Sequence, residues 1–200
     1  MITFYHSPNS RSTRVLSLIH ELDARDRIEV REVTIARVDG SGGPDPANPH
    51  PYGKVPMLDC DGELVWETAA IMLTLTELFP QNGLGVAPGE AGRGRYLSWM
   101  AWYAGVMEPV TIHAAAGLEH PFLDATFRGV PQVVDRLSAA LDEGPWLMGE
   151  RFTAADILCH SPYAWFPEAM PDVPAIRDWV ARCADRPAAR RAREADAAAA

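Results

Sequence analysis

The sequence predicts an α/β domain at about residues 1–80, followed by an all-helical domain at about 90–200. Strand-like hydrophobic alternation appears only in the first part, and the second part shows helical spacing alone. A stretch rich in glycine and proline, residues 81–89, lies between the two patterns and predicts a linker. The 48% hydrophobic content supplies enough apolar side chains for a substantial core.

The first part alternates between strand and helix patterns. The expected elements are a strand at 2–5, a helix at about 11–24, a strand within 28–35, strands near 55–59 and 63–66, and a helix through 70–79. Asp61-Gly62 joins the last two strands as a hairpin turn. The run from Gly40 to Pro51 is saturated with helix breakers and should be mostly loop. This order is compatible with a thioredoxin-like fold, whose additional helix would have to come from that loop.

The second part shows only helical patterns, and three helices can be placed in it. One should span about 90–117 with a kink at Pro109, because proline removes a helical hydrogen bond. A second should span about 130–142. A third begins at Thr153, where Thr153 and Asp156 have capping-box spacing and Phe152 is placed to staple against the following turn. We interpret this motif as a helix start with no direct part in catalysis.

Composition excludes several classes of function. The net charge of −9 disfavours binding to nucleic acid or to an anionic membrane. Cys60, Cys159 and Cys183 are far apart and form no CxxC motif, which favours a reduced, cytoplasmic compartment over a disulfide framework. We expect no leader peptide and no membrane span. The six histidines show no HxxxH or HExxH spacing, so no metal is expected.

Two short motifs predict a site for an extended, anionic, peptide-like ligand. Val55 precedes Pro56, so it should be extended, and this bond is the kind that adopts the cis form. Such a bond can turn backbone N–H and C=O groups towards a ligand. Eleven residues after Pro56, Glu67-Thr68 begins a helix, where the free N–H groups can hold a carboxylate.

The loop between the first strand and the first helix is suited to holding a thiolate. The pKa of a free thiol is ~8.5. It must fall by about two units, equivalent to roughly 2.7 kcal/mol, for the thiol to ionise at neutral pH. One hydrogen bond to the charged form supplies about 1.5–3 kcal/mol, and a helix N-terminus adds roughly 0.3–1 kcal/mol. One hydroxyl is therefore enough. The candidate hydroxyls belong to Tyr5, Ser7, Ser10, Ser12 and Thr13.

Together, these motifs and their spacing resemble those of glutathione transferases. The resemblance implies that Val55 pairs its backbone with the cysteinyl part of glutathione, and that the bond to Pro56 is cis. It also implies that Glu67 meets the α-amino group and Thr68 the α-carboxylate of the γ-glutamyl end. Lys54 and His50 are candidates for the glycine carboxylate, although Lys54 is equally well an exposed loop residue.

The run Ser10-Arg11-Ser12-Thr13-Arg14 is similar to the pattern of serine-type transferases, which selects Ser10 as the thiol activator. Either Ser10 or Ser12 is also suited to act only as the helix N-cap. Tyr5 is the second candidate, because beta-type members carry a tyrosine there, and Ser12 is the third. No cysteine lies between Met1 and Gly53, which disfavours the cysteine-type relatives.

The second-substrate pocket is expected between residues 7–9 and the helical domain. Its candidate lining residues are Pro8, Asn9, Trp99, Tyr103, Met107, His113, Tyr163, Trp165 and Phe166. The aromatic and Met residues of this set suit a hydrophobic core equally well. The resemblance further implies a homodimer acting on a small-molecule electrophile, with glutathione as co-substrate. Alternatives on the same fold are a glutathione-dependent isomerase, dehalogenase or ether-cleaving lyase, and a non-catalytic interaction protein.

Overall fold

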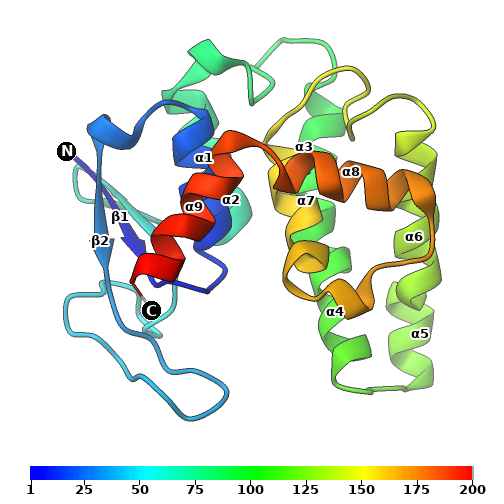
Figure 1. Ribbon diagram of the computed structural model, residues 1–200, viewed down its shortest axis with the longest axis horizontal. Helices are drawn as coiled ribbons and strands as arrows, with labels where there is room; N and C mark the ends of the chain where they lie inside the picture. Colours follow the sequence, from blue (N-terminus) through cyan, green and yellow to red (C-terminus); the bar gives the residue numbers. More distant parts are fainter. Residues whose placement is uncertain (200) are drawn as a thin grey trace. The chain divides into compact units, whose positions relative to one another are not determined.

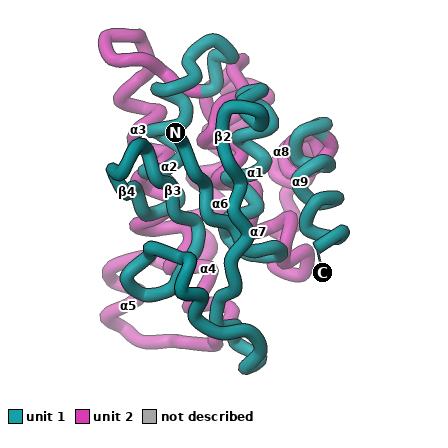
Figure 2. The backbone as a smooth tube through the Cα atoms, turned by 90° about the vertical axis from the view of Figure 1, so that its left-hand side faces the viewer, with its two compact units in different colours: residues 1–84, 186–200 teal, residues 85–185 magenta. Residues whose placement is uncertain are grey.

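A computed structural model describes residues 1–199 and divides the chain into two compact units. Unit 1 comprises residues 1–84 together with the C-terminal segment from Arg186, and unit 2 comprises residues 85–185 (Figure 2). The sequence placed residues 186–199 in the helical domain, whereas the structure groups them with the sheet. No helix within the described residues is long and apolar enough to cross a membrane.

Unit 1 is a sheet with helices. Its elements are β1 (Ile2–His6), α1 (Thr13–Glu21), η1 (Arg25–Arg27), β2 (Ile28–Glu32), β3 (Met57–Cys60), β4 (Glu63–Trp66), α2 (Thr68–Leu78), η2 (Pro80–Asn82) and α9 (Pro187–Ala198). The strand order is β2-β1-β3-β4. β1 runs parallel to β2 and antiparallel to β3, and β3 and β4 form the predicted hairpin. This arrangement confirms the thioredoxin-like prediction.

The core of unit 1 lies between the sheet and α1 and α2, which stand on one face of it (Figure 1). Phe4 at the centre of the sheet and Leu18, Ile19 and Ile71 from the two helices are fully buried. Their burial follows from the period-two spacing of the strand and the helical spacing of α1 and α2. α9 packs against α1 and adds a further layer.

The segment rich in helix breakers, which the structure describes in full, lacks the additional helix that a complete thioredoxin-like fold would have. Within the described part of the chain, residues 33–56 form no helix or strand. The loop prediction is therefore confirmed, and the additional helix is absent from this segment. Its prolines and glycines each disfavour the helix interior.

Unit 2 is helical. Its elements are α3 (Arg93–Trp102), η3 (Tyr103–Met107), α4 (Glu108–Ala115), α5 (Pro121–Phe127), α6 (Gly129–Leu141), α7 (Ala154–Trp165), η4 (Pro167–Ala169) and α8 (Pro174–Ala184). The predicted single helix over 90–117 is wrong in one respect, because the π-helical turn η3 interrupts it. There the N–H of Glu108 bonds to the carbonyl of Tyr103, five residues back. Pro109 follows directly and cannot donate, which explains why the ordinary helical ladder changes at this place.

The capping box at α7 is confirmed. The N–H of Thr153 donates to Asp156 Oδ2 at 2.9 Å, and Thr153 Oγ1 accepts from the N–H of Ala155. Asp156 Oδ1 also accepts from the N–H of Leu147 at 2.9 Å and from Trp179 Nε1 at 3.0 Å. Burial raises the pKa of Asp156, although these hydrogen bonds oppose the shift. Asp156 therefore joins the start of α7 to the preceding loop and to α8.

Candidate functional site

The turn after β1 is built around Ser12. Its side chain is fully buried, and Oγ lies 2.7 Å from His6 Nδ1 and 2.7 Å from Ser10 Oγ. It also accepts from the N–H of Ser7 at 3.1 Å. Ser12 occupies the N-cap position of α1, yet its side chain caps no amide of the helix. The hydroxyl therefore organises the turn from inside and faces no solvent.

Ser10 is the partly exposed hydroxyl of this turn. Its Oγ lies 2.6 Å from the Ser7 carbonyl, to which it donates, and it accepts from the N–H of Ser12 at 3.2 Å. Because one face of Ser10 is open, its hydroxyl can reach a ligand by rotating away from the Ser7 carbonyl.

Tyr5 has a different environment. It is 6% exposed and packs in a cluster with Val33, Met57 and the half-buried Val55. The guanidinium of Arg31 lies 5.6 Å from the centre of the Tyr5 ring. The Tyr5 ring is therefore packed as a core residue of the sheet.

The Val55-Pro56 peptide bond is cis, which confirms the prediction from the motif. The preceding turn is held by its own hydrogen bonds. Asn48 Nδ2 donates to the Lys54 carbonyl at 3.1 Å, and His50 Nδ1 accepts from the N–H of Tyr52 at 3.1 Å. Since Nδ1 accepts, the Nε2 of His50 carries the proton and can donate to a ligand. Partial burial and the positive charge of Lys54 lower the pKa of His50.

Glu67 and Thr68 lie at the start of α2. Glu67 has φ 70° and ψ 126°, a left-handed backbone that costs free energy for a residue with a side chain. No side chain caps the helix, so the first-turn N–H groups at Thr68 and beyond remain available to an anion. A residue held in this conformation at an uncapped helix start is typical of a binding site.

Pro8 and Asn9 line a pocket of about 320 Å³ in unit 1, together with residues of the segment after β2. Arg37 from that segment donates to the carbonyls of Pro8 at 2.7 Å and Asn9 at 3.2 Å.

In unit 2, the remaining candidate residues differ in how exposed their side chains are. Buried are Trp99, Tyr103, Met107 and Tyr163; half-buried are His113 and Trp165; Phe166 is 51% exposed. His113 meets the ring of Phe127 edge-on, at 5.5 Å between centroids.

Sequence reasoning missed three side chains that hold the turn. His6, Asp196 and Arg37 all contact residues 7–13. His6 directly follows the predicted strand at 2–5 and was considered only for metal-ligand spacing, which it lacks. Asp196 lies in an alanine-rich stretch that predicts a frayed end. Among residues 1–199, no group of three or more His, Cys, Asp or Glu side chains is arranged to hold a metal ion.

Comparison with known proteins identifies the family. Residues 6–78 match the model of the glutathione S-transferase N-terminal domain, and residues 110–187 match the model of the C-terminal domain. The chain belongs to the glutathione S-transferase family. Its similarity to individual family members extends over nearly the whole length.

Two curated relatives and one solved structure illustrate that similarity. Glutathione S-transferase 3 of Schizosaccharomyces pombe is 29% identical, over 97% of this chain and 87% of that protein. The disulfide-bond oxidoreductase YfcG of Escherichia coli is 27% identical, over 94% of this chain and 92% of that protein. A sphingomonad glutathione S-transferase, solved in complex with glutathione, is 25% identical, with a TM-score of 0.78 and 98% of each chain covered.

Proposed function

We propose that this protein is a glutathione transferase that ionises glutathione beside Ser10 and joins the thiolate to a small apolar electrophile. The observation that carries this proposal is the joint presence in unit 1 of three features. These are the cis Val55-Pro56 bond, the uncapped start of α2 at Thr68, and the partly exposed Ser10 hydroxyl at the start of α1. The core of the fold does not require these three features to occur together, so their joint presence favours a binding role.

Each end of glutathione has a suitable partner in this arrangement. The extended backbone of Val55 is suited to pair with the cysteinyl peptide unit, as the family resemblance implies. Glu67 would bind the α-amino group, and Thr68 with the first-turn N–H groups would bind the α-carboxylate. The Nε2–H of His50 and the ammonium of Lys54 are suited to the glycine carboxylate.

Calorimetry with glutathione and with an S-alkylated glutathione tests the binding. We expect both to bind, because the contacts with the peptide part do not involve the sulfur. Binding of neither at millimolar concentration would favour a non-catalytic interaction protein. A product screen with varied electrophiles then separates the reactions, since conjugation and lysis consume glutathione and isomerisation does not.

Disulfide reduction is a second candidate, which the similarity to the Escherichia coli oxidoreductase favours. In that reaction two glutathione thiols would be oxidised to glutathione disulfide while the substrate disulfide is reduced to two thiols. The same screen distinguishes it, because the product would be glutathione disulfide and not a thioether. Unit 1 carries one cysteine, Cys60 on β3, whose pKa is raised by burial and by neighbouring carboxylates. The proposed route therefore uses the glutathione thiol and no protein thiol.

Thr68→Val should weaken glutathione binding more than it slows the chemical step. The change removes a hydroxyl at the carboxylate site but leaves the Ser10 turn intact. The expected loss of affinity is roughly 1.5–3 kcal/mol, the range for a hydrogen bond to a charged group. Calorimetry gives the dissociation constant, and single-turnover kinetics gives the chemical rate. Thr74→Val, also on α2 but bonded to the Ala70 carbonyl, is the matched control. Equal losses from both variants would contradict the assignment.

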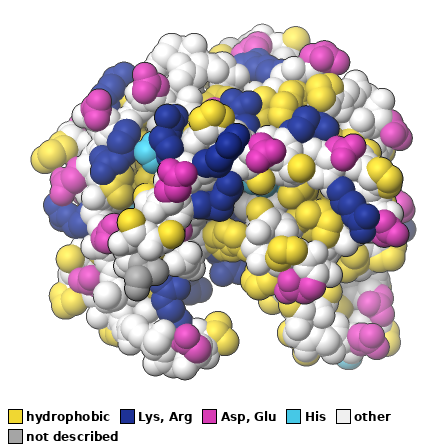
Figure 3. Space-filling model, viewed as in Figure 1, with side chains coloured by type: hydrophobic (Ala, Val, Ile, Leu, Met, Phe, Trp, Pro, Cys, Tyr) yellow, Lys and Arg dark blue, Asp and Glu magenta, His cyan; other side chains and the backbone are white. Residues whose placement is uncertain are grey.

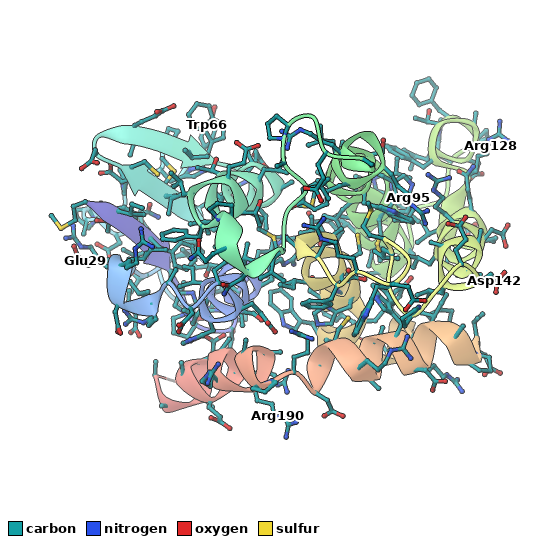
Figure 4. The ribbon with its side chains drawn as sticks, turned by 90° about the horizontal axis from the view of Figure 1, so that it is seen from above. Glu29, Trp66, Arg95, Arg128, Asp142 and Arg190 are labelled. Carbon is teal, nitrogen blue, oxygen red and sulfur yellow. The ribbon has the colours of Figure 1, made fainter. Side chains whose placement is uncertain are left out.

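We also propose a homodimer in the cytoplasm. Two apolar side chains on the same face of edge strand β4 support the dimer, since Leu64 is 37% and Trp66 is 56% exposed. Figure 4 shows Trp66 on β4, on the side of unit 1 away from Arg190 of α9. Three free thiols, at Cys60, Cys159 and Cys183, support a reducing compartment.

The substitution Trp66→Glu should shift the protein from dimer to monomer at micromolar concentration. A charge placed in an apolar interface loses hydration without gaining a partner. Light scattering measures the mass of the wild type and the variant. Arg190→Glu, on the far side of the unit, should leave the mass unchanged. A monomeric wild type would refute the dimer.

A further inference from the structure

A buried chain of hydrogen bonds connects the C-terminal helix to Ser10. Asp196 of α9 lies 3.0 Å from His6 Nε2 through its Oδ1. On the other side of the ring, His6 Nδ1 lies 2.7 Å from Ser12 Oγ, and Ser12 Oγ lies 2.7 Å from Ser10 Oγ. Asp196, His6 and Ser12 are 3%, 2% and 0% exposed, respectively. Ser10, which is partly exposed, is therefore the end of this hydrogen-bond chain that solvent or a ligand can reach.

Asp196 is firmly placed as an ionised acceptor. Besides His6, it accepts from the N–H of Asn9 at 2.8 Å and from the hydroxyl of Thr13. Burial raises the pKa of Asp196, but these three hydrogen bonds outweigh it and hold the pKa below its usual value. An ionised carboxylate only accepts, so His6 Nε2 must carry a proton and donate it. When the imidazole is neutral, Nδ1 is then an acceptor directed at Ser12.

From this geometry we propose that Asp196, His6 and Ser12 act as positioning residues that receive the thiol proton of glutathione through Ser10. This inference rests on the proposed function. The Ser10 hydroxyl turns from the Ser7 carbonyl to Ser12 Oγ. The Ser12 hydroxyl, which can also donate to the Ser7 carbonyl at 3.1 Å, turns to His6 Nδ1 at 2.7 Å. As the S–H bond of glutathione breaks, Ser10 gains that proton and passes its own to Ser12, and Ser12 passes its own to Nδ1.

The transfer is balanced and needs no redox partner. One S–H bond is replaced by one N–H bond, and both serines end with one proton each. The products are a thiolate and an imidazolium, and the imidazolium is paired with the Asp196 carboxylate. After the transfer, every hydrogen bond in this series points towards the ligand: His6 Nδ1–H donates to Ser12, Ser12 donates to Ser10, and Ser10 donates to the thiolate. After the attack, the proton leaves with the leaving group or to solvent.

Other charged groups near the turn have identifiable roles. Arg37 contacts the carbonyls of Pro8 and Asn9, and its Nη2 lies 3.4 Å from Ser7 Oγ. Arg11 precedes α1 and Arg14 lies within it. The positive charge of these side chains would favour a thiolate at the turn, whereas His6 would supply the proton acceptor. Further basic side chains gather over α9 in Figure 3.

The test follows the thiolate absorbance of bound glutathione against pH, in full-length protein. Ser12→Ala cuts the chain but leaves the bond between His6 and Asp196 intact. Asp196→Asn removes the charge that supports the imidazolium. Each should raise the pKa of the bound thiol by about one unit, which is tenfold in the ionised fraction. Because Ser12→Ala keeps α9 anchored through Asp196, it serves where Asp196→Asn fails to fold.

A second readout separates proton transfer from simple support of the turn. Calorimetry in two buffers of different ionisation enthalpy counts the protons released when glutathione binds. In the wild type, clearly fewer than one proton should be released for each thiolate formed, because His6 keeps the rest. In Ser12→Ala, each thiolate formed should release its proton to the buffer. A merely structural role for Ser12 would leave this ratio unchanged.

The matched control is Glu21→Gln. Glu21 of α1 forms a two-fold ion pair with Arg186 at the start of α9, at 2.6 and 2.8 Å. Like Asp196→Asn, this change replaces an acid that anchors α9 by its amide, but it lies outside the chain. The control should leave the thiol pKa and the proton count unchanged. If glutathione binds but the thiol pKa and the proton count are unchanged in Ser12→Ala and Asp196→Asn, the proposed proton transfer to His6 is overturned and the proposed function is not. A wild type that binds no glutathione overturns the proposed function as well.

Discussion

Replacing Asp156 with alanine should destabilise the protein by roughly 3–5 kcal/mol, a loss at the upper end for one substitution. The carboxylate accepts from the N–H groups of Thr153 and Leu147 and from the indole N–H of Trp179. All these groups are buried, so alanine would leave three donors without a partner. Each unsatisfied buried donor costs about 1–3 kcal/mol.

Urea unfolding followed by far-UV circular dichroism measures the free energy of unfolding of the protein. Asp178→Ala is the matched control, because Asp178 is an exposed acid on α8. Its effect should stay within about 0.5 kcal/mol. Thr153→Ala should fall between the two, at about 1 kcal/mol, the usual cost of losing an N-cap. A loss below that of Thr153→Ala would show that Asp156 does not join the three segments.

The capping box illustrates what the sequence can predict. Thr153 and Asp156 are three residues apart, so local spacing alone identifies the motif. The bonds from Asp156 to Leu147 and Trp179 require the tertiary fold and have no local signal. Phe152 shows the same limit. Its staple against the following turn stays a prediction, whereas its edge-on contact with Trp146, at 4.9 Å between ring centroids, has no local signal.

The candidate site divides in the same way. The cis bond before Pro56 and the helix start at Thr68 have short, local sequence signals, and both were predicted. The pairing of His6 with Asp196 spans 190 residues of chain and could not be predicted. Asp196 lies among alanines and charged residues on a helix of low hydrophobicity, a pattern typical of an exposed end. Only the packing of α9 against α1 brings it to the turn.

The interruption of the long helix in unit 2 was located only approximately. Pro109 predicts a break, since proline removes one N–H from the helical ladder. Whether the chain bends, unwinds or widens depends on how the neighbouring turns pack. Here it widens over Tyr103–Met107, where both end residues are buried. Single-sequence patterns do not distinguish a π-helical turn from a kink.

Ser10→Ala should raise the pKa of bound glutathione by about 1–2 units, the equivalent of losing one hydrogen bond of 1.5–3 kcal/mol to a charged group. Ser10 is the partly exposed hydroxyl of the turn, whereas Ser12 is fully buried and Tyr5 packs against Val33 and Met57. At neutral pH the thiolate fraction, and with it kcat/KM, should fall about ten- to a hundred-fold. Glutathione affinity should change less, because the peptide contacts remain.

Thiolate absorbance against pH and the rate with a reactive electrophile measure these effects. Ser10→Thr keeps a hydroxyl at the same place and should recover most of the thiolate. Ser10→Ala should have a larger effect than Ser12→Ala, since only Ser10 would touch the sulfur, while Ser12 acts through it. A titration that Ser10→Ala leaves unchanged would remove Ser10 from this role. Tyr5→Phe and Ser12→Ala would then decide between the other two hydroxyls, and a large shift in Tyr5→Phe would require the ring to leave its packed position beside Met57.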